Sequence, residues 1–105
     1  MELSFKDFKE LIGVNEDDSH PYRIGEKYLI RTVTMIYTGK LKSVYKNELV
    51  ITGAAWVADT GRFAEALEKG KLNEVEVYPE GDVIVGRGAI VDVARWSHPL
   101  PRETK

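Results

Sequence analysis

Runs of β-branched and aromatic residues, separated by turn-forming residues, dominate this sequence. Such residues fit the pleated surface of a β-sheet, whereas an amphipathic helix needs apolar residues at three- and four-residue spacings. The runs are Lys27–Tyr37, Leu41–Tyr45, Glu48–Thr52, Glu74–Tyr78 and Val83–Val93. The pattern predicts a mainly β chain. The first three runs, separated by Thr38-Gly39-Lys40 and Lys46-Asn47, predict an antiparallel meander.

Two short segments have a helical pattern instead. Ser4 is a typical N-cap, and the apolar residues of Phe5–Ile12 share one helix face before Gly13. The second helix is predicted over residues 61–69, with Asp59 or Thr60 as its cap and Gly70 after its last turn. The fold class is therefore α+β with more strand than helix.

A sheet of so few strands has unpaired edges, which closure into a barrel or pairing with another copy would remove. We predict a small, strongly bent five-stranded barrel in which Gly86-Arg87-Gly88 forms a sharp bend. The chain has the length of a single domain, residues 1–105. Residues 1–25 are expected to form the first helix and an acidic loop, 26–96 the barrel core, and 97–105 a flexible tail.

Composition narrows the function classes. The 105 residues include no cysteine, which excludes disulfides and thiolate chemistry, and no apolar run approaches the roughly 18 residues of a membrane span. The net charge of −2 and the absence of clustered Lys and Arg argue against nucleic-acid binding. The chain begins without the pattern of a signal peptide, so a cytoplasmic protein without membrane contact is expected.

Two stretches resemble the motifs of the Sm-like family. Lys27–Ala54, with Thr38-Gly39-Lys40-Leu41 inside it, is similar to the first motif, and Val83–Val91, with its central Arg87-Gly88, is similar to the second. The resemblance implies a bent SH3-like barrel with an N-terminal helix, assembled into rings through its strand edges. The acidic residue and Asn that hold RNA bases in that family fall near Tyr45 and Glu48 here, so the resemblance supports the fold more than RNA binding.

A second resemblance covers most of the chain. Tyr28–Thr34, Ala54–Phe63 and Val83–Asp92 look like segments of a family of small uncharacterised proteins from bacteriophages and bacterial genomes. This resemblance implies a phage or prophage origin and brings no known activity.

Two arginines are candidates for binding an anion. Arg62 lies at the start of the predicted second helix, where the helix dipole disfavours a cation that has no carboxylate or anion beside it. Arg87 lies between two glycines, where its guanidinium can approach a phosphate or carboxylate. A solvated or salt-bridged Arg62 and an outward-facing Arg87 are the alternative interpretations. We predict that the two arginines serve one anion-binding surface, either within a subunit or across a subunit boundary.

Three further candidates complete the predicted site: Asp59, Trp56 and Arg31. Trp56 is expected to form a packing surface. Asp59-Thr60-Gly61 has the triplet of retroviral-type aspartic proteases, in which two carboxylates share a proton. Arg62 stands where those enzymes have a small residue, so we interpret Asp59 as a helix cap. His20 and His98 have no second ligand at metal-binding spacing, and no cofactor is expected.

The leading hypothesis is a non-enzymatic, homo-oligomeric binding protein that holds a small anionic or nucleotide ligand or a protein partner. An RNA-binding ring is the second hypothesis. A small hydrolase using Asp59 is the third.

Overall fold

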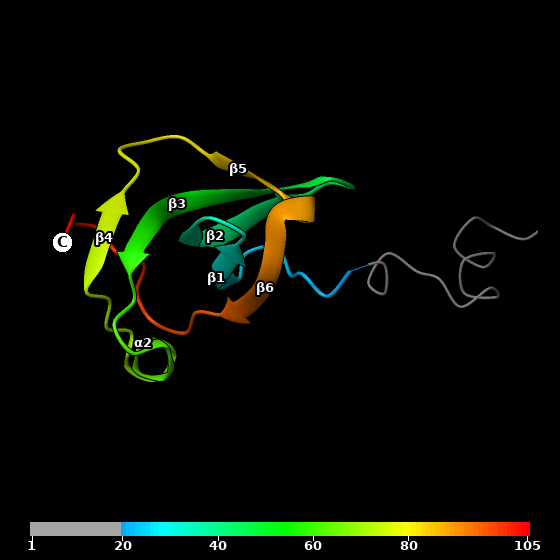
Figure 1. Ribbon diagram of the computed structural model, residues 1–105. Helices are drawn as coiled ribbons and strands as arrows, with labels where there is room; N and C mark the ends of the chain where they lie inside the picture. Colours follow the sequence, from blue (N-terminus) through cyan, green and yellow to red (C-terminus); the bar gives the residue numbers. More distant parts are fainter. Residues whose placement is uncertain (1–19) are drawn as a thin grey trace, which may run out of the picture.

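The computed structural model describes residues 20–105, which form one antiparallel sheet with a single α-helix (Figure 1). The prediction of a mainly β chain is confirmed. The predicted N-terminal helix at Phe5–Ile12 lies outside the described residues. The elements in chain order are β1 (Lys27–Thr32), β2 (Ile36–Val44), β3 (Glu48–Asp59), α2 (Phe63–Lys69), β4 (Glu74–Val77), β5 (Val83–Gly86), the 3-10 turn η1 (Arg87–Ala89) and β6 (Ile90–Arg95).

The sheet is open. Its order is β4-β3-β2-β1-β6, and β5 pairs with the first half of β3 on the same side as β4. Within residues 20–105 no pairing joins β6 to β4 or β5, so the prediction of a closed five-stranded barrel is wrong in closure and strand number. The sixth strand arises because η1 divides the Val83–Val93 run in two. The predicted bend at Gly86-Arg87-Gly88 is therefore present as a 3-10 turn.

The meander forms with its first turn displaced from the predicted position. The β1–β2 turn lies at residues 33–35, and Thr38-Gly39-Lys40 continues through β2. Gly39 is needed there for packing, because a Cβ at this position would lie 2.9 Å from Cδ1 of Ile51 on β3. The prediction of a break at Gly39 confused a close approach between strands with a turn.

β3 is one strand of 12 residues, although its pattern suggested an end at Gly53. Gly53 has a φ of 60°, and the pairing with β2 passes from Ala55 opposite Thr38 to Thr52 opposite Lys40. Between these two pairs β3 advances by three residues while β2 advances by two. The extra residue on β3 defines a β-bulge. A bulge bends the strand and lets its two halves turn their buried side chains to different faces.

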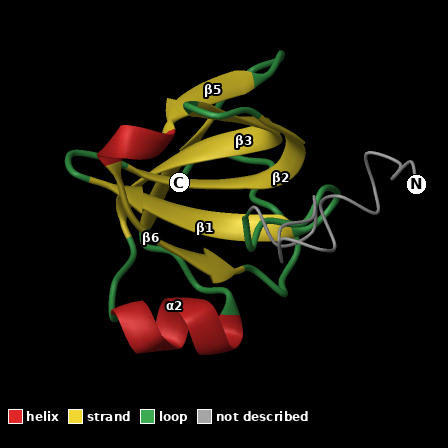
Figure 2. Ribbon diagram, turned by 90° about the vertical axis from the view of Figure 1, so that its right-hand side faces the viewer, coloured by secondary structure: helices red, strands yellow, loops and turns green. Residues whose placement is uncertain are grey.

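Two apolar cores lie on opposite faces of the bent sheet. The first core contains Ile30 from β1 and Leu49 and Ile51 from the first half of β3. The second core contains Leu29 from β1 and Ala55 and Val57 from the second half of β3. β1 is therefore buried on both faces. Figure 2 shows β1, β2 and β3 between β5 at one end and α2 at the other.

Helix α2 covers the second core. Ala66 is fully buried against it, and Phe63 and Leu67 pack at its edge. The predicted helix is confirmed, with its first residue at Phe63 and its N-cap at Arg62. The prediction that Asp59 or Thr60 caps this helix is wrong, because the chain bends at residues 61–62 and Arg62 takes the N-cap position. No helix of the described residues is long and apolar enough to cross a membrane.

Residues 97–105, which we expected to form a loose tail, contact the second core and the outer edge of β4. Trp96 is buried, and its Nε1 donates to the carbonyl of Pro99 at 3.2 Å. Leu100 packs on the second core. Further along, Lys105 exchanges two backbone hydrogen bonds of 2.8 and 3.1 Å with Val75. Pro99 and Pro101, which suggested a flexible tail, lie in the same segment as these contacts.

Candidate functional site

Trp56 lies in a row of side chains that crosses three strands. The pairing sets Tyr37 of β2 opposite Trp56 of β3, and Trp56 opposite Glu76 of β4. Directly paired residues place their side chains on the same face of a sheet. Trp56 is half-buried in this row, whereas Trp96, the other tryptophan, is fully packed in the second core.

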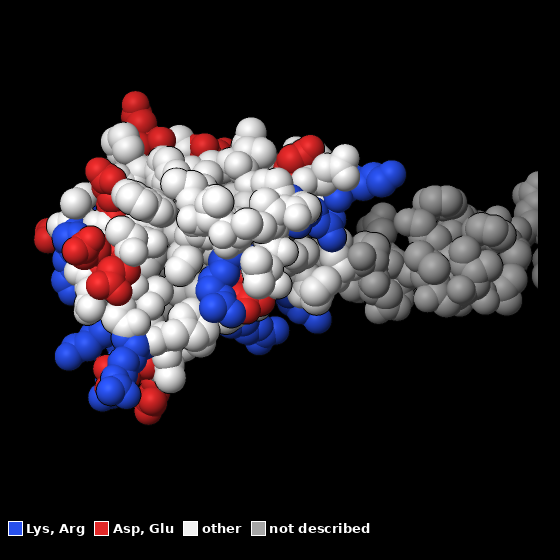
Figure 3. Space-filling view, in the orientation of Figure 1, with Lys and Arg blue, Asp and Glu red and all other residues white. Residues whose placement is uncertain are grey.

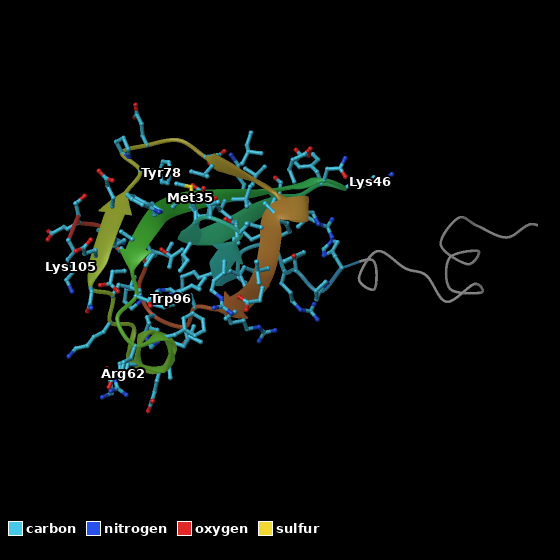
Figure 4. All side chains as sticks on the ribbon, in the orientation of Figure 1. Met35, Lys46, Arg62, Tyr78, Trp96 and Lys105 are labelled. Atoms are coloured by element: carbon cyan, nitrogen blue, oxygen red, sulfur yellow. The ribbon has the colours of Figure 1, made fainter. Side chains whose placement is uncertain are left out.

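An open groove of about 220 Å³ begins at this row. Its lining is mostly apolar: Trp56, Met35 from the β1–β2 turn, and Val77, Tyr78 and Pro79 at the end of β4; the charged member is Glu76. Met35 is 37% exposed. Figure 4 shows Met35 and Tyr78 next to each other above β3. We call these six residues the Trp56 groove.

Tyr37 contacts two of the residues that line the groove. Its hydroxyl donates to Sδ of Met35 at 3.0 Å, and its ring centre lies 6.4 Å from that of Tyr78 at a tilt of 36°. Burial, with a smaller contribution from Tyr78, raises the pKa of Tyr37. The phenol is therefore protonated at neutral pH and available as a donor. Tyr37 thus positions two side chains that line the groove.

The surroundings of the groove are acidic. Glu74 and Glu76 on β4, and Glu80 and Asp82 in the β4–β5 connection, are exposed. Asp82 is paired with Lys42 at 2.6 Å, and the hydrogen bond from Lys42 lowers the pKa of that carboxyl. Figure 3 shows uncharged atoms across the middle of this face, with acidic atoms over β4 and the loop after it. The groove is thus an apolar surface with a negatively charged border.

Arg31 is engaged within the fold. Its guanidinium pairs with both carboxylate oxygens of Asp92, its partner across β1 and β6, and lies 4.6 Å from the ring centre of Phe63. The hydrogen bonds between the two side chains raise the pKa of Arg31 and lower that of Asp92. This pair connects β6, β1 and α2. A ligand would have to compete with a bidentate carboxylate for Arg31.

Asp59 stabilises the turn that precedes α2. Its Oδ1 accepts a hydrogen bond from the backbone N–H of Gly61 at 2.8 Å, and its backbone carbonyl accepts one from Asn73 at 2.9 Å. The side-chain amide of Asn73 lies 3.5 Å from Oδ2. These contacts give the Asp59-Thr60-Gly61 triplet a structural role within the chain, different from the helix cap that we predicted.

The two candidate anion-binding arginines are far apart within the chain. Arg62 precedes α2, whereas the guanidinium of Arg87 donates to the backbone carbonyls of Tyr45 and Lys46 in the β2–β3 turn. Figure 4 shows Arg62 and Lys46 at opposite ends of the molecule. The prediction of one surface shared by Arg62 and Arg87 is therefore wrong within one subunit, and its form across a subunit boundary stays a prediction. Of the five predicted residues, Trp56 alone lies in the groove described above.

The other members of the Trp56 groove were not predicted from the sequence. Met35 was placed near the end of the predicted strand Lys27–Tyr37, and Glu76 and Tyr78 were placed in a strand with no predicted neighbour. The pairing of β4 with β3, which brings Glu76 to Trp56, joins residues 20 positions apart along the chain and has no local signature.

Within residues 20–105, no group of three or more His, Asp or Glu side chains is arranged to hold a metal ion. Nε2 of His98 lies 2.7 Å from the carbonyl oxygen of Leu67 at the end of α2. Compared with known proteins, the sequence matches no protein-family model and no curated protein.

Proposed function

We propose that this protein is a non-enzymatic binding module whose Trp56 groove holds an extended segment of a protein partner. The observation that carries the proposal is the half-buried Trp56 beside Met35, Tyr78 and Pro79 in an open apolar groove. Tryptophan and tyrosine in such positions supply much of the binding energy of protein interfaces. Extended peptides dock in aromatic-lined grooves of this kind.

The charge around the groove defines the chemistry of the partner segment. Glu76 lines the groove, and Glu74 and Glu80 lie on β4 and the loop after it, whereas the Asp82 carboxylate is neutralised by Lys42. An apolar segment that carries a Lys or Arg matches this border, whereas an acidic segment would be repelled. The occupant that we propose is therefore an extended apolar peptide with at least one basic residue.

Peptide selection tests this proposal. A random peptide display library is selected on the wild-type protein, and the enriched peptides are then measured against Trp56→Ala. We expect enriched sequences to combine apolar and basic residues and to lose at least about tenfold in affinity, equal to 1.4 kcal/mol, on Trp56→Ala. The matched control is Tyr45→Ala, because Tyr45 is an aromatic residue 58% exposed in the β2–β3 turn, away from the groove.

Two results would refute the proposal. One is an enriched set that binds Trp56→Ala as tightly as wild type. The other is a selection that enriches no peptide although the protein is folded, as its amide spectrum reports. Glu76→Gln should weaken basic peptides by a smaller factor, since an exposed ion pair contributes about 0 to 1 kcal/mol.

Self-association is a second candidate function, favoured by the open sheet. β5 and β6 each have one edge without a partner strand in the described part of the chain, and they carry the exposed Ile84 (70%) and Val91 (64%). Free edges with exposed apolar side chains favour pairing between copies. In this candidate the assembly has the Sm-like form, and edge pairing completes the open sheet. Sedimentation tests it: Ile84→Lys should yield monomers, and wild-type protein that is monomeric at high concentration would contradict it.

A further inference from the structure

Arg87 is held rigidly at the corner between β5 and β6. Its backbone N–H donates to the carbonyl of Asn47 at 2.8 Å, and its Nη1 donates to the carbonyls of Tyr45 and Lys46 at 2.8 and 3.3 Å. These bonds attach η1 to the β2–β3 turn and fix the direction of the guanidinium. An arginine held in this way loses little side-chain entropy when it binds a ligand.

One edge of this guanidinium has no partner among the described residues. Within residues 20–105, Nε and Nη2 of Arg87 make no hydrogen bond, and no carboxylate pairs with the side chain. The ring of Tyr22 lies 5.5 Å from the guanidinium carbon, which shields one face of the cation. Nε and Nη2 form the fork that binds a carboxylate or phosphate through two parallel hydrogen bonds.

Arg87 also borders an open groove. The groove has a volume of about 790 Å³ and is lined by Tyr22, Lys46 and Arg87 at one end and by β6 residues such as Ile90 and Val93 along its length. A Cβ added at Gly86 or Gly88 would meet no described atom within 4 Å, so the backbone on either side of Arg87 is open. The acidic residue in the lining, Asp92, is occupied by Arg31.

We propose that Arg87 binds an oxyanion, a carboxylate or phosphate group, at the end of this groove. Arg87 supplies the two-pronged contact, and Lys46 adds a second positive charge. The site differs from the anion-binding surface predicted from sequence, because Arg62 has no part in it. It is also separate from the Trp56 groove, whose border is negative. Binding of the isolated group should be weak, with a Kd on the order of 1 mM, since a single half-buried cation provides most of it.

Inorganic phosphate and acetate are the probes, each compared with chloride at equal ionic strength. The NMR signal of the Arg87 Nε–H is followed in the wild-type protein, and the melting temperature is measured in parallel. We expect a saturable shift of that signal and a rise in melting temperature. A response to phosphate alone identifies a phosphate ligand, and a response to both identifies a site for either group. No response to either probe overturns the proposal.

Two variants distinguish anion binding at Arg87 from a nonspecific effect of anions on stability. Arg87→Lys keeps a donor for the Tyr45 carbonyl but lacks the fork, so the rise in melting temperature should disappear while the amide spectrum stays native. Arg62→Lys is the matched control at an exposed arginine on the other end of the molecule, and it should respond as wild type does. The proposal is overturned if Arg87→Lys keeps the response or if Arg62→Lys loses as much of it. The wild-type Nε–H signal decides the question even if Arg87→Lys does not fold.

Discussion

Replacing Thr38 with valine should stabilise the protein. Thr38 is 0% exposed in the middle of β2, between Leu29 of β1 and Ala55 of β3, which are also fully buried. Its Oγ1 has no hydrogen-bond partner among residues 20–105. In the unfolded chain this hydroxyl binds water, so folding removes a hydrogen bond that the described structure does not replace. Valine has nearly the same shape and no polar group to desolvate.

The expected gain follows from two contributions of the same sign. A buried hydroxyl without a partner costs about 1 to 3 kcal/mol, and the buried methyl group that replaces it contributes up to about 0.8 kcal/mol. We therefore expect the free energy of unfolding to rise by at least about 1 kcal/mol. For a domain of this size that corresponds to an increase in melting temperature of about 4 °C or more.

Urea denaturation measures this change, because a pure stability effect raises the midpoint and leaves the slope m unaltered. Thr32→Val is the matched control. The Thr32 Oγ1 donates to the carbonyl of Met35 and accepts from its N–H, each at 2.9 Å, in the β1–β2 turn. Its loss should destabilise by about 1 kcal/mol. A lower midpoint for Thr38→Val, or an equal rise for both variants, would refute the reasoning.

Three further changes test the packing and the charges. Gly39→Ala places a Cβ 2.9 Å from Cδ1 of Ile51 and should cost about 1 to 3 kcal/mol, measured by urea denaturation. Gly70→Ala, at the helix C-cap with a φ of 72°, should lower the melting temperature in calorimetry. Asp92→Asn removes a carboxyl whose pKa Arg31 lowers. The Asp92 contribution to stability is present above the ordinary aspartate pKa of about 3.9 and is lost as pH falls through the lower folded value. Stability of wild type should therefore fall more steeply in acid than that of Asp92→Asn; parallel curves would contradict the assigned pair.

The sequence predicted the elements better than their connections. β-branched runs and the apolar spacing of Phe63 and Leu67 act over a few residues, and they produced the strands and α2 near their observed positions. The errors occurred at glycines. Gly39 and Gly53 both suggested strand ends, but one makes room for Ile51 and the other forms a bulge inside β3. A glycine needed for long-range packing and a glycine needed for a turn have the same local sequence.

The prediction of a closed barrel was wrong for a related reason. Unpaired edges in a small sheet predict that something covers them, but local patterns do not identify the covering segment. Part of the β4 edge is covered by Lys105, from a segment whose prolines suggested looseness, and α2 covers the second core. These contacts join positions distant in sequence, so they could be found only in the assembled fold.

The roles of the charged residues were also difficult to predict from local sequence. Sequence position identified Asp59 and Arg87 as unusual, and Arg31 was a further candidate. The structure gives each a structural role, in a turn, a hairpin contact and an ion pair respectively. A charged residue near a glycine is therefore ambiguous, because a bent backbone exposes carbonyls and N–H groups that need partners as much as a ligand does. Arg87 satisfies two such carbonyls with one nitrogen and still has two donor nitrogens without a described partner. The structural role holds the guanidinium in place, and that fixed position is what makes the remaining edge suited to an oxyanion.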